Sequence, residues 1–422
     1  MNRVTLERRK SADVLIAIAL CCALLAAGRA PAHDWPQLHG PQRDGVYRGS
    51  DVFEKWPDAG PKVLWEKPIG TGFSGPAVAD GRLIVFHRRG PEEIIACFEA
   101  VSGKDLWTYP YPTAYRDDFG FDNGPRGTPA IDSGRVYTFG AEGVLTCVDA
   151  SNGKRLWNVD THEKFQVKKG FFGAACSPLV DAGRVLVVVG GSGDAGIVAF
   201  DAEKGKVVWK ATDHEASHSS PVVAQLGTER HAFFFTRRGL VDLDPATGRV
   251  RFEERWRPRM NASVNGATPL VVGDRVFVST SYHTGGLLVR VRGDRHEKVW
   301  SGDEVLSNHY ATSVHHKRYL YGIHGRQEYK AHLRCVELET GKVQWSKERF
   351  GTGSLIVVGD RLLILHEDGD LILAAASPEE FRSHGSSKVL GSAVRAYPAL
   401  ANGLLYARDG KKLVCVDLRE HH

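Results

Sequence analysis

Short apolar stretches rich in β-branched residues recur along the chain, each bounded by turns that contain glycine. The clearest copy runs from Gly127 to Trp157 and reads GTPAIDSGRVYTFGAEGVLTCVDASNGKRLW. It contains a Pro, a short apolar stretch, Gly-Arg, a β-branched run, a Cys two residues before Asp, then Gly-Lys and a Trp. Apolar runs of this length between turn signals predict β-strands. The pattern therefore predicts an all-β protein.

The same sequence unit occurs about eight times, at a spacing that fits one structural repeat. The copies end at Trp65, Trp107, Trp157, Trp209, Trp300 and Trp345. The first four tryptophans are 42, 50 and 52 residues apart, and the last two are 45 apart. The fourth copy carries Phe252 where Trp is expected, and a seventh copy has lost both the Asp and the Trp. A period of about 40–50 residues is typical of one four-stranded propeller blade.

The two ends of the repeated region complete each other. The chain opens the repeat with a last-strand sequence around Trp65 and ends it with Cys415-x-Asp417, which lacks a last strand. Together they make one full copy, so the amino-terminal strand is expected to pair in the carboxy-terminal blade. Residues 61–422 are thus predicted to form an eight-bladed β-propeller of four-stranded antiparallel blades, closed by its first and last strands.

The spacing A-x-D-x-x-x-G-x-x-x-W, intact at Ala199, Asp201, Gly205 and Trp209, resembles the tryptophan-docking repeat of the pyrroloquinoline quinone (PQQ) propeller superfamily. The resemblance implies that each Trp packs between adjacent blades, with its N–H bound to backbone. The lead-in segment, residues 33–60, resembles that of exported bacterial propellers described as PQQ-binding-like. In architecture the chain also resembles the propeller lipoprotein of the outer-membrane β-barrel assembly machinery, which has eight blades and no catalysis.

The first 32 residues have the pattern of an export signal. Basic residues precede the uncharged run Val14–Ala27, which is too short to span a bilayer, and Ala30-Pro31-Ala32 suits signal peptidase. We expect cleavage near Ala32 and a mature chain in the periplasm or cell envelope. Cys21 and Cys22 leave a lipid anchor as an alternative, although Ile18-Ala19-Leu20 is a poor lipobox.

Composition and charge exclude several classes of protein. Of 422 residues, 42% are hydrophobic and 25% charged, which is typical of a globular chain. Cleavage removes five basic and two acidic side chains, leaving 50 basic against 48 acidic and a net charge of +2. Such a chain has no electrostatic footprint for nucleic acid or anionic membrane, and no second apolar stretch reaches membrane length.

The cysteines and the one histidine motif predict structural roles, with neither disulfides nor a metal site. Four cysteines occupy one phase of the repeat and therefore lie in different blades, too far apart for disulfides, so we expect small buried residues; they are Cys97, Cys147, Cys335 and Cys415. His214-Glu215-Ala216-Ser217-His218 matches a zinc-protease motif, but it falls in a link between blades that leaves little room for the required helix. We predict no metal site.

The resemblance raises the question of a quinone cofactor. PQQ-dependent dehydrogenases of the superfamily carry an adjacent Cys pair under the cofactor, a calcium held by Glu and Asn, and a catalytic Asp. The one adjacent pair of this chain, Cys21-Cys22, lies in the signal segment. PQQ is therefore implied by the family alone, and no cofactor is predicted from the residues.

A candidate site emerges when the starts of the innermost strands are aligned. Three residues before each start stand Phe73, Arg126, Ala175, His218, Gly266, His309, Thr352 and Arg395. All four even-numbered blades place Arg or His here, at one mouth of the central channel, and Asn265 and Asn308 precede two of the positions. The alignment predicts a ring that binds an anion such as a carboxylate or a sulfated or phosphorylated sugar. The alternative is that wet channel mouths accept any polar residue.

One further segment departs from strand alternation. Residues Gly322–Tyr329, GIHGRQEY, interrupt the sixth blade, and we interpret them as a long hairpin turn, with a ligand-contacting loop as the alternative.

The expected function is binding. We predict a monomeric, non-catalytic binding or scaffold propeller whose partner is an envelope protein or a small anionic ligand. The alternatives are a quinoprotein oxidoreductase that uses the channel for its cofactor, and a hydrolase that uses Arg126, His218 and His309. Neither shows a nucleophile, base and orienting group at diagnostic spacing, so no catalytic residue is predicted.

Overall fold

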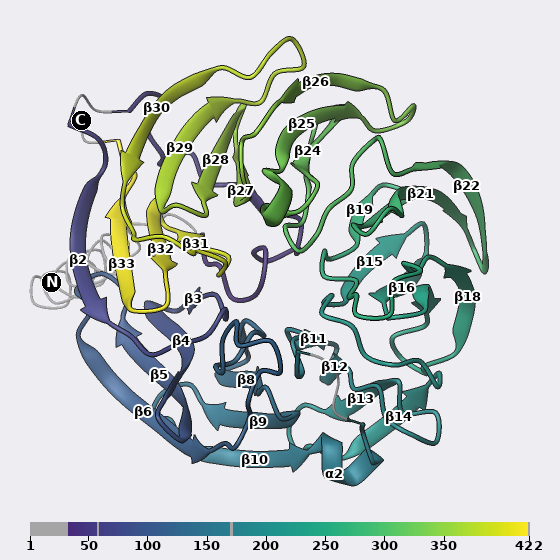
Figure 1. Cartoon of the computed structure of the whole chain (residues 1–422). Helices are drawn as coiled ribbons and strands as arrows, with labels where there is room; N and C mark the ends of the chain where they lie inside the picture. The colour runs from purple at the N-terminus through teal and green to yellow at the C-terminus, as the bar shows by residue number, and fades with distance from the viewer. Residues whose placement is uncertain (1–32, 57–58, 169–171, 421–422) are drawn as a thin grey trace, which may run out of the picture. The chain divides into compact units, whose positions relative to one another are not determined.

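The computed structural model, which describes residues 33–56, 59–168 and 172–420, contains a ring of eight antiparallel β-sheets around a central axis (Figure 1). Residues 34–422 form one compact unit. The predicted eight-bladed propeller is therefore confirmed. The predicted signal segment, with Cys21 and Cys22, lies outside the described residues.

Each blade has four strands, numbered outward from the axis except where the ring closes. Blades one to four contain β3 (Ala77–Ala79), β4 (Arg82–Arg89), β5 (Glu92–Glu99) and β6 (Asp105–Pro112); β7 (Ala130–Asp132), β8 (Arg135–Phe139), β9 (Val144–Asp149) and β10 (Arg155–Asp160); β11 (Leu179–Asp181), β12 (Arg184–Val188), β13 (Ile197–Asp201) and β14 (Val207–Ala211); and β15 (Val222–Leu226), β16 (Glu229–Phe235), β17 (Gly239–Leu243) and β18 (Val250–Arg255). A short helix, α2 (Thr161–Phe165), follows β10.

Blades five to eight complete the ring. They contain β19 (Leu270–Val272), β20 (Arg275–Thr280), β21 (Gly285–Arg292) and β22 (Arg295–Gly302); β23 (Val314–His316), β24 (Tyr319–His324), β25 (His332–Glu337) and β26 (Val343–Lys347); β27 (Gly353–Val358), β28 (Arg361–His366), β29 (Asp370–Ala375) and β30 (Ser383–Lys388); and β31 (Ala399–Ala401), β32 (Leu404–Arg408), β33 (Lys412–Asp417) and β2 (Lys62–Pro68). The 3₁₀ turn η1 (Gln327–Tyr329) lies in the connection from β24 to β25; of the predicted hairpin-turn segment Gly322–Tyr329, residues 322–324 continue strand β24 and the connection begins at Gly325.

Burial explains the sequence pattern of the strands. A middle strand such as β4 is packed between neighbouring blades on both faces, so Ile84, Val85 and Phe86 are all fully buried. An outer strand such as β6 has one face toward solvent, and its exposed and partly buried residues alternate. Continuous apolar runs therefore mark middle strands, and alternation marks outer ones.

The ring closes through its first and last strands, as predicted. Strand β2 pairs antiparallel with β33, placing Val63 opposite Val416 and Trp65 opposite Cys415. The two strands lie side by side at the edge of the ring in Figure 1. Five free cysteines, including the four of the shared phase and Cys176, are buried in the blades.

Six tryptophans at one position of the repeat each connect a blade to the next. Each indole N–H donates to a backbone carbonyl of the following blade, as Trp157 does to Ala202 at 3.0 Å and Trp300 does to Leu338 at 2.7 Å. The same bond is made by Trp65, Trp107, Trp209 and Trp345. A turn glycine of the following blade packs against the indole ring: a Cβ at Gly205 would approach Trp157 to 2.7 Å. The same close approach is made by Gly103, Gly153, Gly248 and Gly341, each against the Trp of the preceding blade, which accounts for glycine at this turn position.

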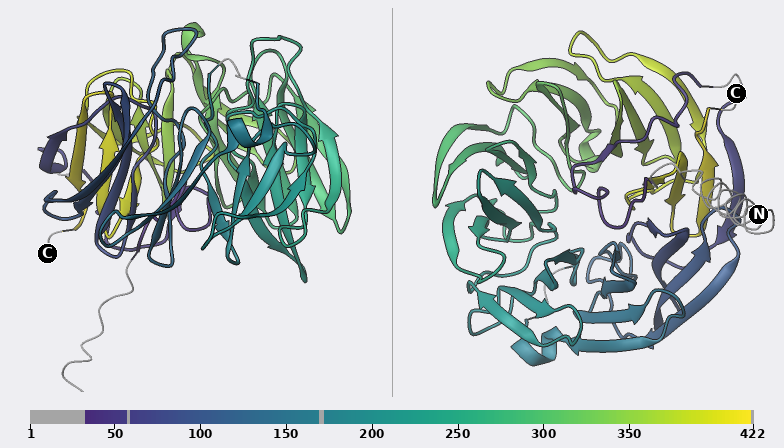
Figure 2. Two further views of the ribbon diagram at one scale, coloured as in Figure 1. Left: turned by 90° about the horizontal axis from the view of Figure 1, so that it is seen from below. Right: turned by 180° about the vertical axis from the view of Figure 1, so that it is seen from behind.

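The lead-in segment is folded into the ring. Strand β1 (Val46–Tyr47) adds to the inner edge of blade seven in parallel with β27, and Val357 donates its N–H to the carbonyl of Gly45 at 2.8 Å. Seen from behind, the purple lead-in crosses the centre of the ring (Figure 2). Arg43, 2% exposed, donates to the backbone carbonyls of Ser177, Pro178 and Pro221. The lead-in therefore obstructs one end of the central channel.

Blade seven takes its missing tryptophan from the lead-in. Gly385 stands opposite Leu373, the register position that a docking Trp holds in other blades, such as Trp157 opposite Cys147. Trp56 fills this place, because a Cβ at Gly385 would lie 2.1 Å from its Cδ1 atom. The degenerate seventh repeat is therefore completed by a residue from outside the repeat.

Candidate functional site

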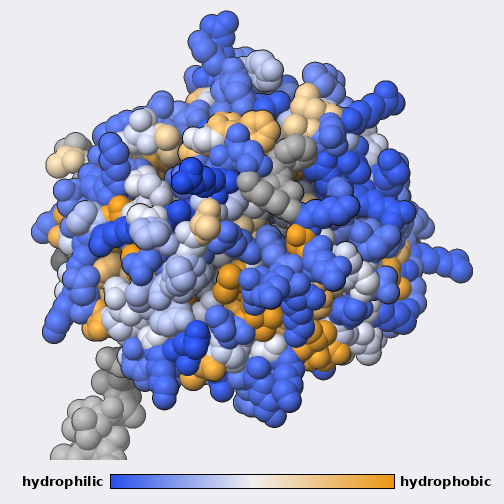
Figure 3. Space-filling view, turned by 60° about the horizontal axis from the view of Figure 1, so that its bottom comes forward, coloured by the Kyte–Doolittle hydropathy of each residue, from blue (hydrophilic) through white to orange (hydrophobic). Residues whose placement is uncertain are grey.

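A cavity of about 290 Å³ lies in the centre of the ring, above the lead-in. Connecting segments of seven blades line it, together with Leu38 of the lead-in. Phe119 and Phe121, 52% and 51% exposed, line it and also reach the surface. On the face drawn in Figure 3, apolar patches are small and separated by hydrophilic side chains. The cavity, in contrast, gathers several aromatic side chains in one place: Phe73, Phe119, Phe121, Phe172, Tyr282, Tyr310 and Tyr397.

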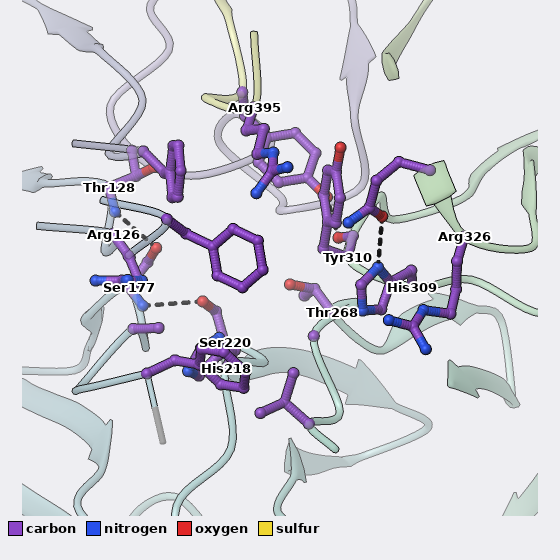
Figure 4. Close-up of a pocket in the computed structure, with 18 of the residues that line it drawn as sticks. Arg126, Thr128, Ser177, His218, Ser220, Thr268, His309, Tyr310, Arg326 and Arg395 are labelled. Carbon is purple, nitrogen blue, oxygen red and sulfur yellow. Dashed lines mark hydrogen bonds between the residues drawn. The ribbon is translucent and has the colours of Figure 1, made fainter. Parts of the chain in front are cut away.

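The positions aligned from the sequence do meet at this cavity. Seven of the eight line it, and Thr352 is the exception, with its hydroxyl bound to that of Tyr310 at 2.9 Å. Arg126, His218, His309 and Arg395 are drawn around the cavity in Figure 4. Equivalent positions in a closed ring face the same axis, which is why the repeat phase brings these four residues together.

Arg126 is neutralised within the protein. Its guanidinium donates to the Asp117 carboxylate at 2.6 Å, and the two side chains are 8% and 0% exposed. It also donates to the carbonyls of Gly124 and Asp122. Because the charge is already paired, Arg126 contributes shape and hydrogen bonding to the cavity more than attraction for an anion.

The two histidines of the ring are neutral at pH 7. Burial, followed by the charge of Arg126, lowers the pKa of His218 to about 3. Burial also lowers the pKa of His309, whose Nδ1 and Nε2 atoms contact Gln327 Oε1 and the Tyr282 hydroxyl, both at 2.8 Å. Of the four aligned Arg and His residues, desolvation therefore keeps two uncharged and Asp117 balances the charge of a third.

Arg395 is the cation that remains. Its guanidinium carbon lies 5.3 Å from the ring centre of Phe73, 5.5 Å from Phe121 and 5.9 Å from Tyr310. Among the residues that the structure describes, no carboxylate forms an ion pair with Arg395. The side chain is partly exposed toward the cavity that it lines. An aromatic environment of this kind holds a guanidinium in place while leaving its N–H donors available.

Asn265 and Asn308 do not line the cavity. The Asn265 amide donates to the carbonyl of Thr236 at 2.8 Å, and that of Asn308 donates to Ile323 at 2.8 Å. Both residues are 1% exposed. The expectation that they contribute to the ring is corrected, because one residue's step along an extended segment turns the side chain away from the axis.

The hydroxyl groups near the axis hold blades together. Each accepts a backbone N–H from the preceding blade, as Ser177 Oγ does from Thr128 at 2.8 Å and Ser220 Oγ does from Ser177 at 2.9 Å (Figure 4). Thr128 and Thr312 accept in the same way from Gly75 and Thr268. These oxygens therefore have a structural partner before any ligand is considered.

Much of the cavity wall was not predicted from the sequence. Phe119, Phe121 and Tyr282 come from connections outside the aligned phase, as do Arg326 and Gln327 near η1. The alternative interpretation of Gly322–Tyr329 as a ligand-contacting loop is consistent with this position. The disruption of strand alternation was the available signal for that loop. The aromatic pair at 119 and 121 had no comparable signal.

The two histidines of the zinc-like motif do not converge on one site. Residues 212–221 form a link without helix, and its two histidines line different hollows: His218 the central cavity, His214 a smaller one beside Arg238. No group of three or more His, Cys, Asp or Glu within 33–56, 59–168 and 172–420 is placed to hold a metal ion.

The cavity's donor set does not fit a calcium-bound quinone. The cysteines of the described blades are single and buried, and no adjacent pair lies under the cavity. Glu328, an acid that lines it, is paired with Arg326 at 3.1 Å and accepts from Gln327 at 3.0 Å. The residues of this cavity therefore give PQQ neither the cysteine pair nor a free carboxylate for its calcium.

Fold and cavity together define a closed propeller with an aromatic central pocket. A sequence model described as outer membrane protein assembly factor BamB matches residues 91–347, more than half of the chain. The protein belongs to this family. No curated protein matches the chain.

Solved structures show the same fold at low sequence identity. BamB from Moraxella catarrhalis has a TM-score of 0.62 and 16% identity, covering 86% of this chain and 98% of that one. Quinohemoprotein alcohol dehydrogenase from Comamonas testosteroni has a TM-score of 0.64 and 14% identity, covering 95% of this chain and 83% of that one. The fold is therefore shared by an assembly factor and an oxidoreductase, and it does not decide between them. In the described part of the chain, no helix has the length and apolar character to cross a membrane.

Proposed function

We propose that the protein is an exported, non-catalytic binding propeller of the periplasm or cell envelope that takes a small anionic ligand in its central cavity. Arg395 carries this proposal, because it is a cation in an aromatic pocket without a carboxylate partner among the described residues. Such a group gains most from a ligand that brings a carboxylate, sulfate or phosphate oxygen to its N–H donors.

The shape of the cavity restricts the rest of the ligand. Its walls include the rings of Phe73, Phe172 and Tyr310, and its volume is about 290 Å³. Apolar and aromatic walls with few polar groups are typical of small-molecule pockets, in which the apolar lining supplies affinity and the polar groups fix orientation. We infer a compact ligand with a flat or apolar body and one anionic group.

A role as a scaffold is compatible with this ligand. Membership of the BamB family supports an envelope location and contact with an envelope protein. Residues 1–32 support export through their signal pattern. We propose that the chain acts as a monomer, since both ends are used to complete its own ring.

The experiment compares anionic ligands with neutral analogues of the same shape. Isothermal titration of the purified protein with benzoate and benzamide, and with glucuronate and methyl glucoside, is expected to show binding of the anions. Arg395→Gln should weaken their binding roughly 10- to 100-fold, since a charged hydrogen bond is worth about 1.5–3 kcal/mol. Arg292→Gln is the matched control, because Arg292 is exposed on β21 and pairs with Glu297 at 3.6 Å.

Two outcomes would contradict the proposal. One is equal binding of anions and neutral analogues by the unaltered protein. The other is unchanged affinity in Arg395→Gln. Incubation with PQQ and calcium, followed by dye reduction, tests the oxidoreductase alternative; turnover there would replace binding with catalysis as the function.

A further inference from the structure

A chain of four polar side chains borders the cavity: Tyr282, His309, Gln327 and Glu328. The Tyr282 hydroxyl contacts His309 Nε2 at 2.8 Å, and His309 Nδ1 contacts Gln327 Oε1 at 2.8 Å. The Gln327 amide nitrogen then donates to Glu328 Oε1 at 3.0 Å. Tyr282, His309 and Gln327 all line the cavity.

The direction of every hydrogen bond in this chain is determined. Glu328 is a carboxylate held by Arg326, so it accepts, and the Gln327 amide must turn its nitrogen toward Glu328. The Gln327 oxygen therefore faces His309 and accepts the proton on Nδ1. Burial lowers the pKa of His309 and keeps the ring neutral, so Nε2 carries a lone pair. That lone pair accepts the Tyr282 hydroxyl proton.

Because the Tyr282 hydroxyl donates its proton to His309 Nε2, the Tyr282 oxygen can only accept a hydrogen bond from any further group. The oxygen therefore keeps lone-pair capacity for a donor, and Tyr282 is one of the residues that line the cavity.

The backbone supports a functional role for this tyrosine. Tyr282 has a φ of 63°, in the left-handed region that bulky residues rarely adopt, and the next residue, His283, has a φ of 58°. Such a conformation is sterically unfavourable for a residue that carries a side chain. The Arg326 guanidinium lies 4.6 Å from the Tyr282 ring centre and helps to hold the ring in place.

We propose that Tyr282 is a specificity-determining residue that selects ligands carrying a hydrogen-bond donor as well as an anionic group, as hydroxy-substituted carboxylates do. The inference rests on the proposed function: Arg395 binds the anion, and Tyr282 accepts a hydroxyl proton from the body of the same ligand. His309 and Gln327 are positioning residues, because they act through the tyrosine. An anion without a donor uses only half of this arrangement.

The test uses two carboxylates of similar size, of which glucuronate carries hydroxyl groups and cyclohexanecarboxylate carries none. Tyr282→Phe keeps the ring and removes the acceptor. It should weaken glucuronate binding about 3- to 10-fold, as expected for one neutral hydrogen bond, and leave cyclohexanecarboxylate unchanged. Arg395→Gln should weaken both. Tyr319→Phe, on strand β24 away from the cavity lining, is the control for loss of a tyrosine hydroxyl.

The positioning role has its own measurement. Gln327→Leu should allow His309 to populate both neutral tautomers, which ¹⁵N chemical shifts of the imidazole distinguish, and should reduce glucuronate affinity by a similar factor. The inference is overturned if Tyr282→Phe weakens both ligands equally or neither, while Arg395→Gln still weakens both; the proposed function then stands alone. If the unaltered protein binds neither carboxylate, both proposals fail.

Discussion

Arg43→Met tests whether the lead-in is an integral part of the propeller. Methionine keeps an unbranched side chain of similar length but has no donors for the carbonyls of Ser177, Pro178 and Pro221. In the described residues, no acidic side chain pairs with Arg43; Gln37 Oε1 accepts from its Nε at 3.0 Å. The three carbonyls come from blades three and four, so the substitution removes a link between the lead-in and the far side of the ring.

The expected loss follows from two opposing contributions. Three hydrogen bonds from a charged donor contribute about 5–9 kcal/mol in total. Burial lowers the pKa of Arg43 to about 10, which shows that burying the cation costs roughly 3 kcal/mol. The difference predicts that Arg43→Met lowers the free energy of unfolding by about 2–6 kcal/mol.

The assay is urea unfolding followed by tryptophan fluorescence, with limited proteolysis of the lead-in as a second readout. Arg48→Met is the matched control in the same segment, because Arg48 is 47% exposed and pairs with Asp44 at 2.5 Å. A surface ion pair of this kind contributes about 0–1 kcal/mol. If Arg43→Met and Arg48→Met unfold at the same urea concentration, the lead-in is not anchored as the structure indicates.

Two further predictions concern packing and pH. Gly385→Ala should destabilise the protein by about 1–3 kcal/mol, because its Cβ would lie 2.1 Å from Trp56, whereas Gly410→Ala should be close to neutral, since nothing lies within 4 Å; thermal unfolding compares the two, and a harmless Gly385→Ala would contradict the packing. Burial, followed by the charge of Arg43, lowers the pKa of His39 to about 3, so the unfolded chain binds this proton near pH 6.5 and the folded one does not. The contribution of the uncharged His39 to the free energy of unfolding is therefore fully present above pH 6.5. It decreases as the pH drops toward 3, by about 2 kcal/mol between pH 7 and 5. Urea unfolding at both pH values should show a smaller loss in His39→Phe, and an identical loss would refute the assignment.

The sequence predicted the repeated part of the fold because every blade solves the same packing problem. Middle strands need apolar residues on both faces, and a docking Trp such as Trp157 needs a glycine turn against it, here Gly205. The same phase correctly brought Arg126 and Arg395 to one axis. Their charges were not predictable in this way, because the pairing of Arg126 depends on Asp117, which lies in a connection of irregular sequence.

The lead-in and the cavity rim were beyond periodic reasoning. Trp56 substitutes for a residue missing from a blade about 330 positions later in the chain, and no local pattern links it to Gly385. Tyr282 and Gln327 meet His309 only because three connections converge above the ring. Contacts of this type depend on loop conformation, which varies in length and composition from blade to blade.

The pairing of β2 with β33 has a consequence for how the chain acquires its structure. The strand near residue 65 has to wait until residue 415 has been made, and β1 waits similarly for β27. Contacts so distant in sequence form slowly, because the intervening chain must first be brought together. During synthesis the earliest blades therefore stand as an open arc with an unsatisfied first edge, and only the last strand to emerge turns that arc into a circle.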